Sequence, residues 1–232
     1  MRGILVADLA CPLVPAADII LLAPYLAGLS ADAADVVGMM PIGSANEALL
    51  AALPPPGGAS SRTVIAALFL CDPFLRGRRL FERLRGRGVS GIVNWPTINL
   101  IPPGVYRQAL DTAGLDPGAE LTALGEAREA GLEAMATVAT YDQAARAVEA
   151  GITALLLHPG TPTGESGLDQ RLLEGVIASM VRIKAMPQRP RVALYRHPGF
   201  GGLIAPAAEL ADDVFDWAVT QRPVQLDSVQ TV

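Results

Sequence analysis

Polar side chains with catalytic chemistry stand where short apolar runs of this sequence stop. Two such runs, "TVIAALFLCD" and "GIVNWP", carry Asp72 and Asn94 next to a proline. The two histidines of the chain follow apolar runs in the same way, His158 in "TALLLHPG" and His197 in "RVALYRHPG". A carboxylate, an amide and two imidazoles can together move a proton and stabilise an oxyanion. The sequence therefore predicts an acid–base site, provided that these run ends meet in space.

Each of these residues also has a structural interpretation. Asp72 precedes Pro73 and a helical pattern, so it fits a helix N-cap followed by proline. Asn94 fits this role less well, because Trp95-Pro96 favours an extended chain and no helix is expected before about residue 103. A lone histidine is usually structural, but two beside Pro-Gly favour a site. The loops "PGTPTGESG" and "PGFGG" could offer backbone N–H groups to a phosphate or carboxylate.

Eight apolar runs alternate with segments of helical periodicity. The expected strands are 4–8, 18–24, 63–72, 91–96, 133–140, 153–160, 191–199 and 216–223, and the expected helices include 44–53, 75–88, 118–131, 141–151, 168–186 and 206–214. Apolar strands alternating with helices are typical of a parallel sheet covered on both faces. Eight such units in 232 residues predict one (β/α)8 TIM barrel spanning residues 1–232.

A barrel of this kind has its active site at the C-terminal ends of the strands. The residues expected at that rim are Asp8, Asp72, Asn94, Thr140, His158, His197 and Arg222. We expect the side chains of Asp72, Asn94 and His158 to converge on one pocket there.

Two connections fit the barrel poorly. Only nine residues, 9–17, separate the first two expected strands, and only nine follow Pro223. The first and last outer helices are therefore expected to be missing or vestigial. Those strands are neighbours in a closed barrel, so without the helices their outer faces would be bare. A second copy of the chain could cover these faces, and we therefore expect a homo-oligomer, a dimer or a multiple of it. The loop at 25–40, the C-terminal tail or a different partner chain are alternative covers.

Composition limits the partners. The chain is 51% hydrophobic and 18% charged with a formal net charge of -5, which gives no electrostatic reason to expect nucleic acid or an anionic membrane. The arginine-rich run 76–87 fits the solvated face of a helix. Two cysteines form no disulfide framework and fit a reducing cytoplasm. Asp8 and Asp18 interrupt the apolar N-terminal stretch, which is too short to span a bilayer.

The same residues carry a family resemblance. Asp72-Pro73-Phe74, a helix and then Asn94-Trp95-Pro96-Thr97 resemble the DPF and NFPT motifs of the phosphoenolpyruvate hydrolase-like TIM-barrel family. "AVEAGITALLLHPGTPTGE" is similar to that family's AGAD…HMGLTTGG segment, and "PIGSANEALLAA" to its PYGDANE segment. The resemblance covers about residues 38–165 well and the C-terminal third in outline. The matched positions are Asn46, Glu47, Asp72, Asn94, Thr97, Arg107, Gly114, His158, Gly160, Thr163 and Gly164.

The chain also departs from the family pattern. It lacks the family's arginine-containing GRFRMAG loop, and His197 matches the histidine of CHGGP only with a shift of one residue. The SSMERLP motif is reduced to "VTQRPV", which keeps Arg222 and Pro223. The family motifs at the ends of strands three, four and six are therefore present, whereas much of the motif set on the opposite side of the barrel mouth is absent.

The resemblance implies a hydrolase or lyase that acts on a small oxoacid or enol-type substrate by C–C, C–P or ester bond cleavage. In that mechanism Asn94 holds an enolate or oxyanion, and His158 or His197 moves a proton. Arg222 pairs with a substrate carboxylate or phosphate. The other residues expected to bind substrate are Asn46, Glu47, Thr97, Gly160, Thr163 and Gly164.

A metal and other functions stay open at this point. Asp72 is expected to act as base or, with Asp8, as ligand to Mg2+, although no ligand spacing demands a metal. One alternative is a barrel that has lost the parent activity and serves as a binding or regulatory subunit, as in family members labelled signal-transduction proteins or found in plant antiviral proteins. Another is an enzyme refitted for a different substrate in specialised metabolism.

Overall fold

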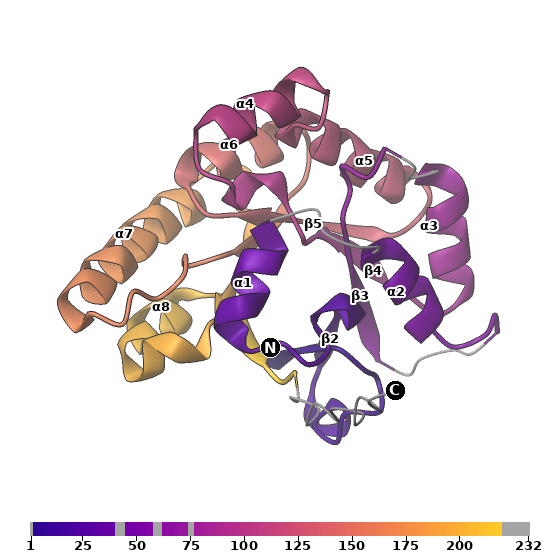
Figure 1. The fold of residues 1–232 in the computed structure, drawn as a ribbon, viewed down its shortest axis with the longest axis horizontal. Helices are drawn as coiled ribbons and strands as arrows, with labels where there is room; N and C mark the ends of the chain where they lie inside the picture. The colour runs from indigo at the N-terminus through magenta and orange to yellow at the C-terminus, as the bar shows by residue number, and fades with distance from the viewer. Residues whose placement is uncertain (1, 40–44, 58–61, 74–76, 220–232) are drawn as a thin grey trace, which may run out of the picture.

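The chain forms a closed barrel of eight parallel strands (Figure 1). A computed structural model describes residues 2–39, 45–57, 62–73 and 77–219. Each strand pairs with the next along the chain, and β8 closes the ring on β1. The strands are β1 Arg2–Val6, β2 Ile19–Leu22, β3 Thr63–Leu68, β4 Gly91–Asn94, β5 Glu133–Val138, β6 Ala154–Leu157, β7 Arg191–Arg196 and β8 Asp213–Trp217. The predicted TIM barrel is confirmed.

Helices surround this barrel. The α-helices are α1 Ala31–Met39, α2 Ala45–Ala52, α3 Gly77–Gly86, α4 Val105–Thr112, α5 Pro117–Glu129, α6 Tyr141–Glu149, α7 Ser166–Lys184 and α8 Ala205–Leu210. Four 3-10 turns join them, η1 Val14–Ala16, η2 Pro24–Leu26, η3 Ile98–Leu100 and η4 Pro198–Ile204. Within the described part of the chain, no helix has the length and apolar character needed to cross a membrane.

The last strand differs from its prediction. It begins at Asp213 rather than at residue 216. In the sequence, the two adjacent aspartates at 212 and 213 indicated the end of a helix. In the structure, however, the buried Asp213 carboxylate accepts a hydrogen bond from Arg191 on β7 at 2.8 Å, so an ion pair keeps the charge in the strand.

The first outer helix is missing, as predicted, and is replaced by the single turn η1. The apolar outer face of β1 is nevertheless covered, because Ile4 and Val6 are buried and the loop residues Leu9, Cys11 and Val14 pack against the same core cluster. The loop therefore covers the outer face of β1, and the predicted homo-oligomer stays a prediction. The segment that would form the last outer helix lies outside the described residues.

The helix α1 was not predicted and lies across the C-terminal mouth of the barrel. It contacts η3, which follows β4, and η4, which follows β7 on the far side of the ring. Its Ala34 is fully buried and packs with the barrel-interior cluster. Figure 1 shows α1 near the centre of the view, with the other helices around the barrel. The helix therefore covers the end of the barrel where a site is expected.

A buried carboxylate fixes the chain that follows β4. Glu120 on α5 accepts hydrogen bonds from Asn94 Nδ2 at 2.7 Å, from the Thr97 hydroxyl at 2.6 Å and from the Ile98 N–H at 3.1 Å. Asn94 Oδ1 in turn accepts from the Thr137 N–H on β5 at 2.6 Å. We call these three side chains and two backbone N–H groups the Glu120 knot. It ties β4, β5, η3 and α5 together.

Asn94→Ala should destabilise the protein, because it leaves the buried Thr137 N–H unpaired and removes a donor from Glu120. At about 1–3 kcal/mol for each buried group left unsatisfied, we expect the free energy of unfolding to fall by about 2–4 kcal/mol. Urea denaturation measures this change. A variant with unchanged stability would refute this structural role of Asn94 and would favour its predicted catalytic role.

Burial raises the pKa of Glu120 from the ordinary value of 4.5 to about 7, against the opposing effect of its hydrogen bonds from Thr97, Asn94 and Ile98. Between these values the folded state binds more protons than the unfolded state, so the contribution of this carboxyl to stability is full below pH 4.5 and is lost as the pH rises through 7. At about 1.4 kcal/mol per pKa unit, the loss is roughly 3 kcal/mol.

We therefore expect Glu120→Gln to remove most of this pH-dependent loss. The measurement is the difference in unfolding free energy between the variant and the original protein from pH 4.5 to 8. Glu126→Gln, on the exposed face of the same helix, is the matched control. Parallel pH profiles for Glu120→Gln and the original protein would contradict the assignment.

Candidate active site at the barrel mouth

The two His-Pro-Gly turns hold their histidines in the same way. The Gly160 N–H donates to His158 Nδ1 at 3.2 Å, and the Gly199 N–H donates to His197 Nδ1 at 3.0 Å. A nitrogen that accepts a hydrogen bond carries no proton, so each neutral ring has its proton on Nε2. The turn thus fixes the tautomer and presents Nε2–H as the donor.

Both histidines belong to one buried group of rings beneath α1. The Tyr195 ring centroid lies 5.2 Å from that of His158 and 5.8 Å from that of His197. Trp95, directly after β4, lies 5.7 Å from His158 and 5.0 Å from Tyr195. His158 is 3% exposed and the other three are 0% exposed. We call these four residues the mouth cluster; the structure brings the two predicted histidines together there.

His197 also faces the helix that covers the mouth. Its Nε2 lies 3.5 Å from the Asp32 carboxylate at the start of α1. A hollow of 400 Å³ is lined by His197, Arg196 and Asp216, among others. Arg196 and Asp216 form an ion pair, so the charge at this edge is largely balanced.

A cavity of 630 Å³ reaches His158 from the outside, between the segments that follow β4, β5 and β6. Its polar walls include Asn99, Gln143 and two arginines, Arg107 and Arg146. The complete lining is Asn99, Leu100, Ile101, Pro102, Pro103, Arg107, Asp111, Ala139, Thr140, Gln143, Arg146, His158, Gly160 and Thr161. We call this space the His158 cavity.

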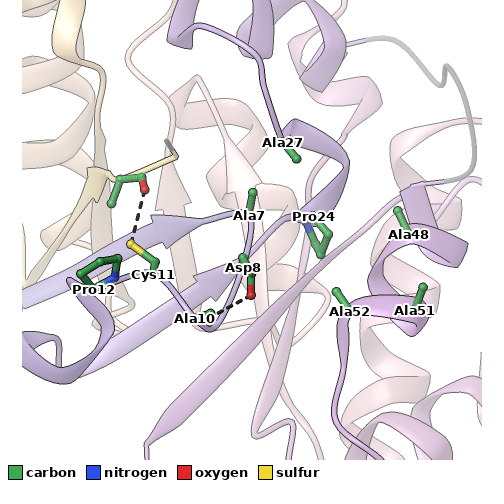
Figure 2. A pocket seen from close by; sticks show the side chains of 11 residues that line it. Ala7, Asp8, Ala10, Cys11, Pro12, Pro24, Ala27, Ala48, Ala51 and Ala52 are labelled. Atoms are coloured by element: carbon green, nitrogen blue, oxygen red, sulfur yellow. Dashed lines mark hydrogen bonds between the residues drawn. The ribbon is translucent and has the colours of Figure 1, made fainter. Parts of the chain in front are cut away.

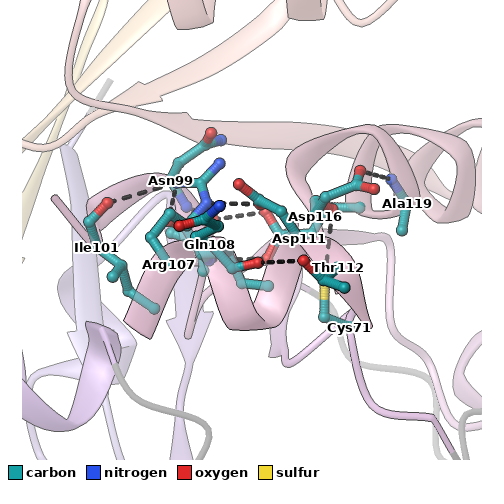
Figure 3. Close-up of polar contacts among 12 residues, drawn as sticks. Cys71, Asn99, Ile101, Arg107, Gln108, Asp111, Thr112, Asp116 and Ala119 are labelled. Carbon is teal, nitrogen blue, oxygen red and sulfur yellow. Dashed lines mark hydrogen bonds and ion pairs between the residues drawn. The ribbon is translucent and has the colours of Figure 1, made fainter. Parts of the chain in front are cut away.

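The charges of the His158 cavity favour an anion. Arg107 donates to the Ile98 carbonyl at 3.0 Å. It also pairs with Asp111 at 2.8 Å, so its charge is mostly balanced (Figure 3). Arg146 is exposed on α6 and adds a second positive charge to the wall. With His158 neutral, the formal charge of the lining is +1.

A second cavity, of 510 Å³, lies beside the ends of β1 and β2 (Figure 2). Alanines and prolines form most of its wall, together with Asp8 and Cys11. Asp8 accepts a hydrogen bond from the Ala10 N–H at 2.9 Å, and the Cys11 thiol lies 3.7 Å from the Ala218 carbonyl. This cavity offers one carboxylate and little else that is polar.

Asp72 lies with Asn46 rather than with the histidines. Asn46 Nδ2 donates to Asp72 at 3.1 Å and to the Phe69 carbonyl at 3.0 Å, while its Oδ1 accepts from the Phe69 N–H. Glu47, the next residue, is exposed. Among the described residues, no three acidic, histidine or cysteine side chains gather as a metal site, and the Mg2+ role expected for Asp8 and Asp72 stays a prediction.

The remaining predicted site residues that the structure describes lie in three places. Asn94 and Thr97 belong to the Glu120 knot. Thr163 donates to Asp169 at 2.8 Å ahead of α7, where Gly164 has a φ of 79°. Gly160 lines the His158 cavity, and Arg222 lies outside the described residues. Asp72, Asn94 and His158 therefore have separate partners instead of one shared pocket, and the catalytic roles proposed for them remain predictions.

The sequence interpretation missed Trp95, Tyr195 and Glu120. The two aromatic residues were included in strand runs as core residues, although polar atoms at their ends suit a site. Glu120 carried a usable signal. It stands at helical spacing from Ala123, Leu124 and Ala127, all buried, so it is a charge on the apolar face of its helix.

Comparisons with known proteins identify a family and several relatives. The sequence profile of a family described as phosphoenolpyruvate hydrolase-like matches residues 14–210. The uncharacterized protein y4oT of Sinorhizobium fredii is 33% identical over 139 residues, which are 60% of this chain and 70% of that protein. The ToMV resistance protein Tm-1(GCR237) of Solanum lycopersicum is 31% identical over 103 residues, 44% of this chain but only 14% of that protein.

Solved structures are similar in outline only. Tryptophan synthase from M. tuberculosis has a TM-score of 0.45 at 20% identity, over 94% of this chain and 82% of that chain. Triosephosphate isomerase from Bartonella henselae has a TM-score of 0.44 at 12% identity, over 93% and 91%. These likenesses carry no information about chemistry. The profile match, which spans most of the sequence, is decisive: the chain belongs to the phosphoenolpyruvate hydrolase-like family.

Proposed function

We propose that this chain is an enzyme that breaks a C–C, C–P or ester bond in a small anionic oxoacid or enol-type substrate. One observation carries the proposal: His158 belongs to the buried mouth cluster and also lines the His158 cavity. A substrate in that cavity would therefore contact a histidine that is otherwise surrounded by buried rings. The cavity volume of 630 Å³ falls within the range usual for small-molecule sites.

The fixed tautomer decides what His158 does in this proposal. Because Nδ1 accepts from Gly160, the neutral ring offers Nε2–H and has no free lone pair with which to act as a base. His158 therefore acts as a hydrogen-bond donor to the substrate oxygen that becomes an enolate or oxyanion. Each of the three bond cleavages can develop negative charge on such an oxygen, and a preorganised donor stabilises it.

The charge of the cavity selects the substrate class. Arg146 supplies a positive charge on the wall, and Arg107 is largely neutralised by Asp111. A carboxylate or phosphate group of the substrate would sit against Arg146, with its reacting oxygen toward His158. This arrangement matches a small acid better than a neutral sugar or an amine.

His158→Asn tests this role, because the asparagine Oδ1 can still accept from Gly160 while the Nε2–H is lost. We expect kcat to fall by about 10²–10³, the usual cost of one oxyanion donor, with the thermal midpoint unchanged. The assay is a panel of 2-oxo acids, enol phosphates and phosphono-oxoacids, followed by release of pyruvate or phosphate.

Arg146→Gln is the matched comparison on the same cavity wall. It should raise KM and leave kcat near its original value, because it removes binding charge and not the oxyanion donor. Equal kcat for His158→Asn and the original protein would eliminate His158 from the chemistry.

A second candidate is a binding module without catalysis. The observation in its favour is that α1 covers the barrel mouth and that Asn94 is committed to the Glu120 knot. The name of the tomato relative, a resistance protein, describes a role other than a stated reaction. Failure of the full substrate panel, together with binding of a member of it, would favour this alternative.

A further inference from the structure

One stretch of the His158 cavity lining is apolar. Leu100, Ile101, Pro102 and Pro103 follow one another in the chain, and all four line the cavity. Leu100 is half-buried and both prolines are exposed, so a ligand can reach their side chains. We call residues 100–103 the apolar wall. Arg146, which carries the binding charge of the proposed function, lines the cavity from α6, after the next strand.

The apolar wall has no backbone donor left for an anion. Pro102 and Pro103 have no N–H group. The N–H groups of the other two residues already donate to the carbonyls of Thr97 and Ile98, at 3.5 Å and 3.0 Å. An anionic group would therefore gain no hydrogen bond from this backbone, whereas a hydrocarbon group gains by leaving water.

Hydrogen bonds hold the apolar wall in place without a ligand. The Arg107 guanidinium donates to the Ile101 carbonyl at 3.4 Å (Figure 3). Gln143 on α6 joins the two sides of the cavity, because its Nε2 donates to the Asn99 carbonyl at 2.8 Å and its Oε1 accepts from the Ala139 N–H at 2.7 Å. The cavity is therefore preformed, as most small-molecule sites are.

The cavity is larger than the smallest acids need. A three-carbon oxoacid has six non-hydrogen atoms, and at the share of about 30 Å³ that a water molecule takes in the liquid it fills at most roughly 180 Å³. The cavity measures 630 Å³. Such an acid, held at the charged side of the cavity, would leave most of the space unfilled. A larger hydrocarbon group on the same acid would use it.

We propose that the apolar wall is a subsite for an aliphatic or aromatic group, so that the ligand of the cavity is an amphipathic acid rather than a three-carbon one. The inference rests on the proposed function for the acidic group and for its place against Arg146 and His158. The hydrocarbon part of the ligand covers residues 100–103. The wall selects the ligand by the water that its apolar surface releases, and Arg146 selects it by charge.

A series of straight-chain 2-oxo acids tests the subsite, from pyruvate with three carbons to 2-oxooctanoate with eight. A methylene group that is fully buried against an apolar surface strengthens binding about fourfold. Isothermal titration calorimetry should therefore give an affinity that rises with chain length, by about two- to fourfold for each added carbon, since the cavity opens to solvent and buries the chain in part.

Two kinds of variant separate the hydrocarbon part from the acidic group. Pro102→Ser combined with Pro103→Ser makes the wall polar, so it should flatten the rise with chain length and leave the affinity for pyruvate near its original value. Pro187→Ser, in the exposed turn after α7, is the matched control and should keep the rise. Arg146→Gln should weaken the binding of every acid by a similar factor, because all of them share the charge.

The outcomes separate this proposal from the function. A rise that the double variant loses supports the subsite, even if no acid is turned over and the proposed reaction fails. An affinity that is constant or falls with chain length overturns the subsite, and turnover of a three-carbon substrate by the same protein would leave the function standing. A rise that persists in the double variant also overturns the subsite.

Two further results are decisive. If no acid of the series binds, the subsite is overturned, while the enol phosphates and phosphono-oxoacids of the substrate panel still test the function. If the double variant fails to fold, Leu100→Ala takes its place, because it shortens a half-buried side chain of the same wall. A flatter rise in Leu100→Ala supports the subsite, and an unchanged rise overturns it.

Discussion

The buried carboxylate of Glu120 is the constraint on which the candidate site depends. Its three hydrogen bonds hold Asn94, Thr97 and the backbone of Ile98 against α5, so the chain after β4 turns at one place. That turn directs Trp95 into the barrel and brings Asn99 to the wall of the His158 cavity. Asn99 Nδ2 then donates to the Thr137 carbonyl at 3.0 Å, which continues the network to β5. A charge buried at this depth is costly, and its near-neutral pKa reflects that cost.

Next to the Glu120 knot, the barrel mouth holds several hydrogen-bond donors. The His-Pro-Gly turns orient both imidazoles through Nδ1, and the rings of Trp95 and Tyr195 exclude solvent between them. Helix α1 covers the top, and the His158 cavity opens from the side. Electrostatic stabilisation of an oxyanion works best in such a dry and prearranged setting. The account of function therefore rests on geometry at His158 and on the family to which the chain belongs.

The sequence predicted the barrel because strand period and strand number are local properties that eight apolar runs repeat. It also located both histidines at the mouth, since residues at the C-terminal ends of parallel strands share one edge. The sequence interpretation pointed the Asn94 side chain into the barrel mouth, but it points outward. Side chains alternate along a strand, and because Val93 and Trp95 face the barrel interior, Asn94 faces the helices. It also missed α1 as a cover. The apolar face of α1 is little more than Ala34 and Val37, and its contacts across the barrel mouth are long-range.

The central claim is that His158 presents a proton on Nε2 to an anionic ligand. The most direct measurement is 15N NMR of histidine-labelled protein, which is simple to interpret because the chain has only two histidines. The account predicts Nε2–H tautomers for both rings and a change at the His158 Nε2–H on addition of oxalate, with His158→Asn providing the assignment. A His158 ring protonated on Nδ1 in its neutral form, or a His158 signal indifferent to every small acid tested, would contradict it.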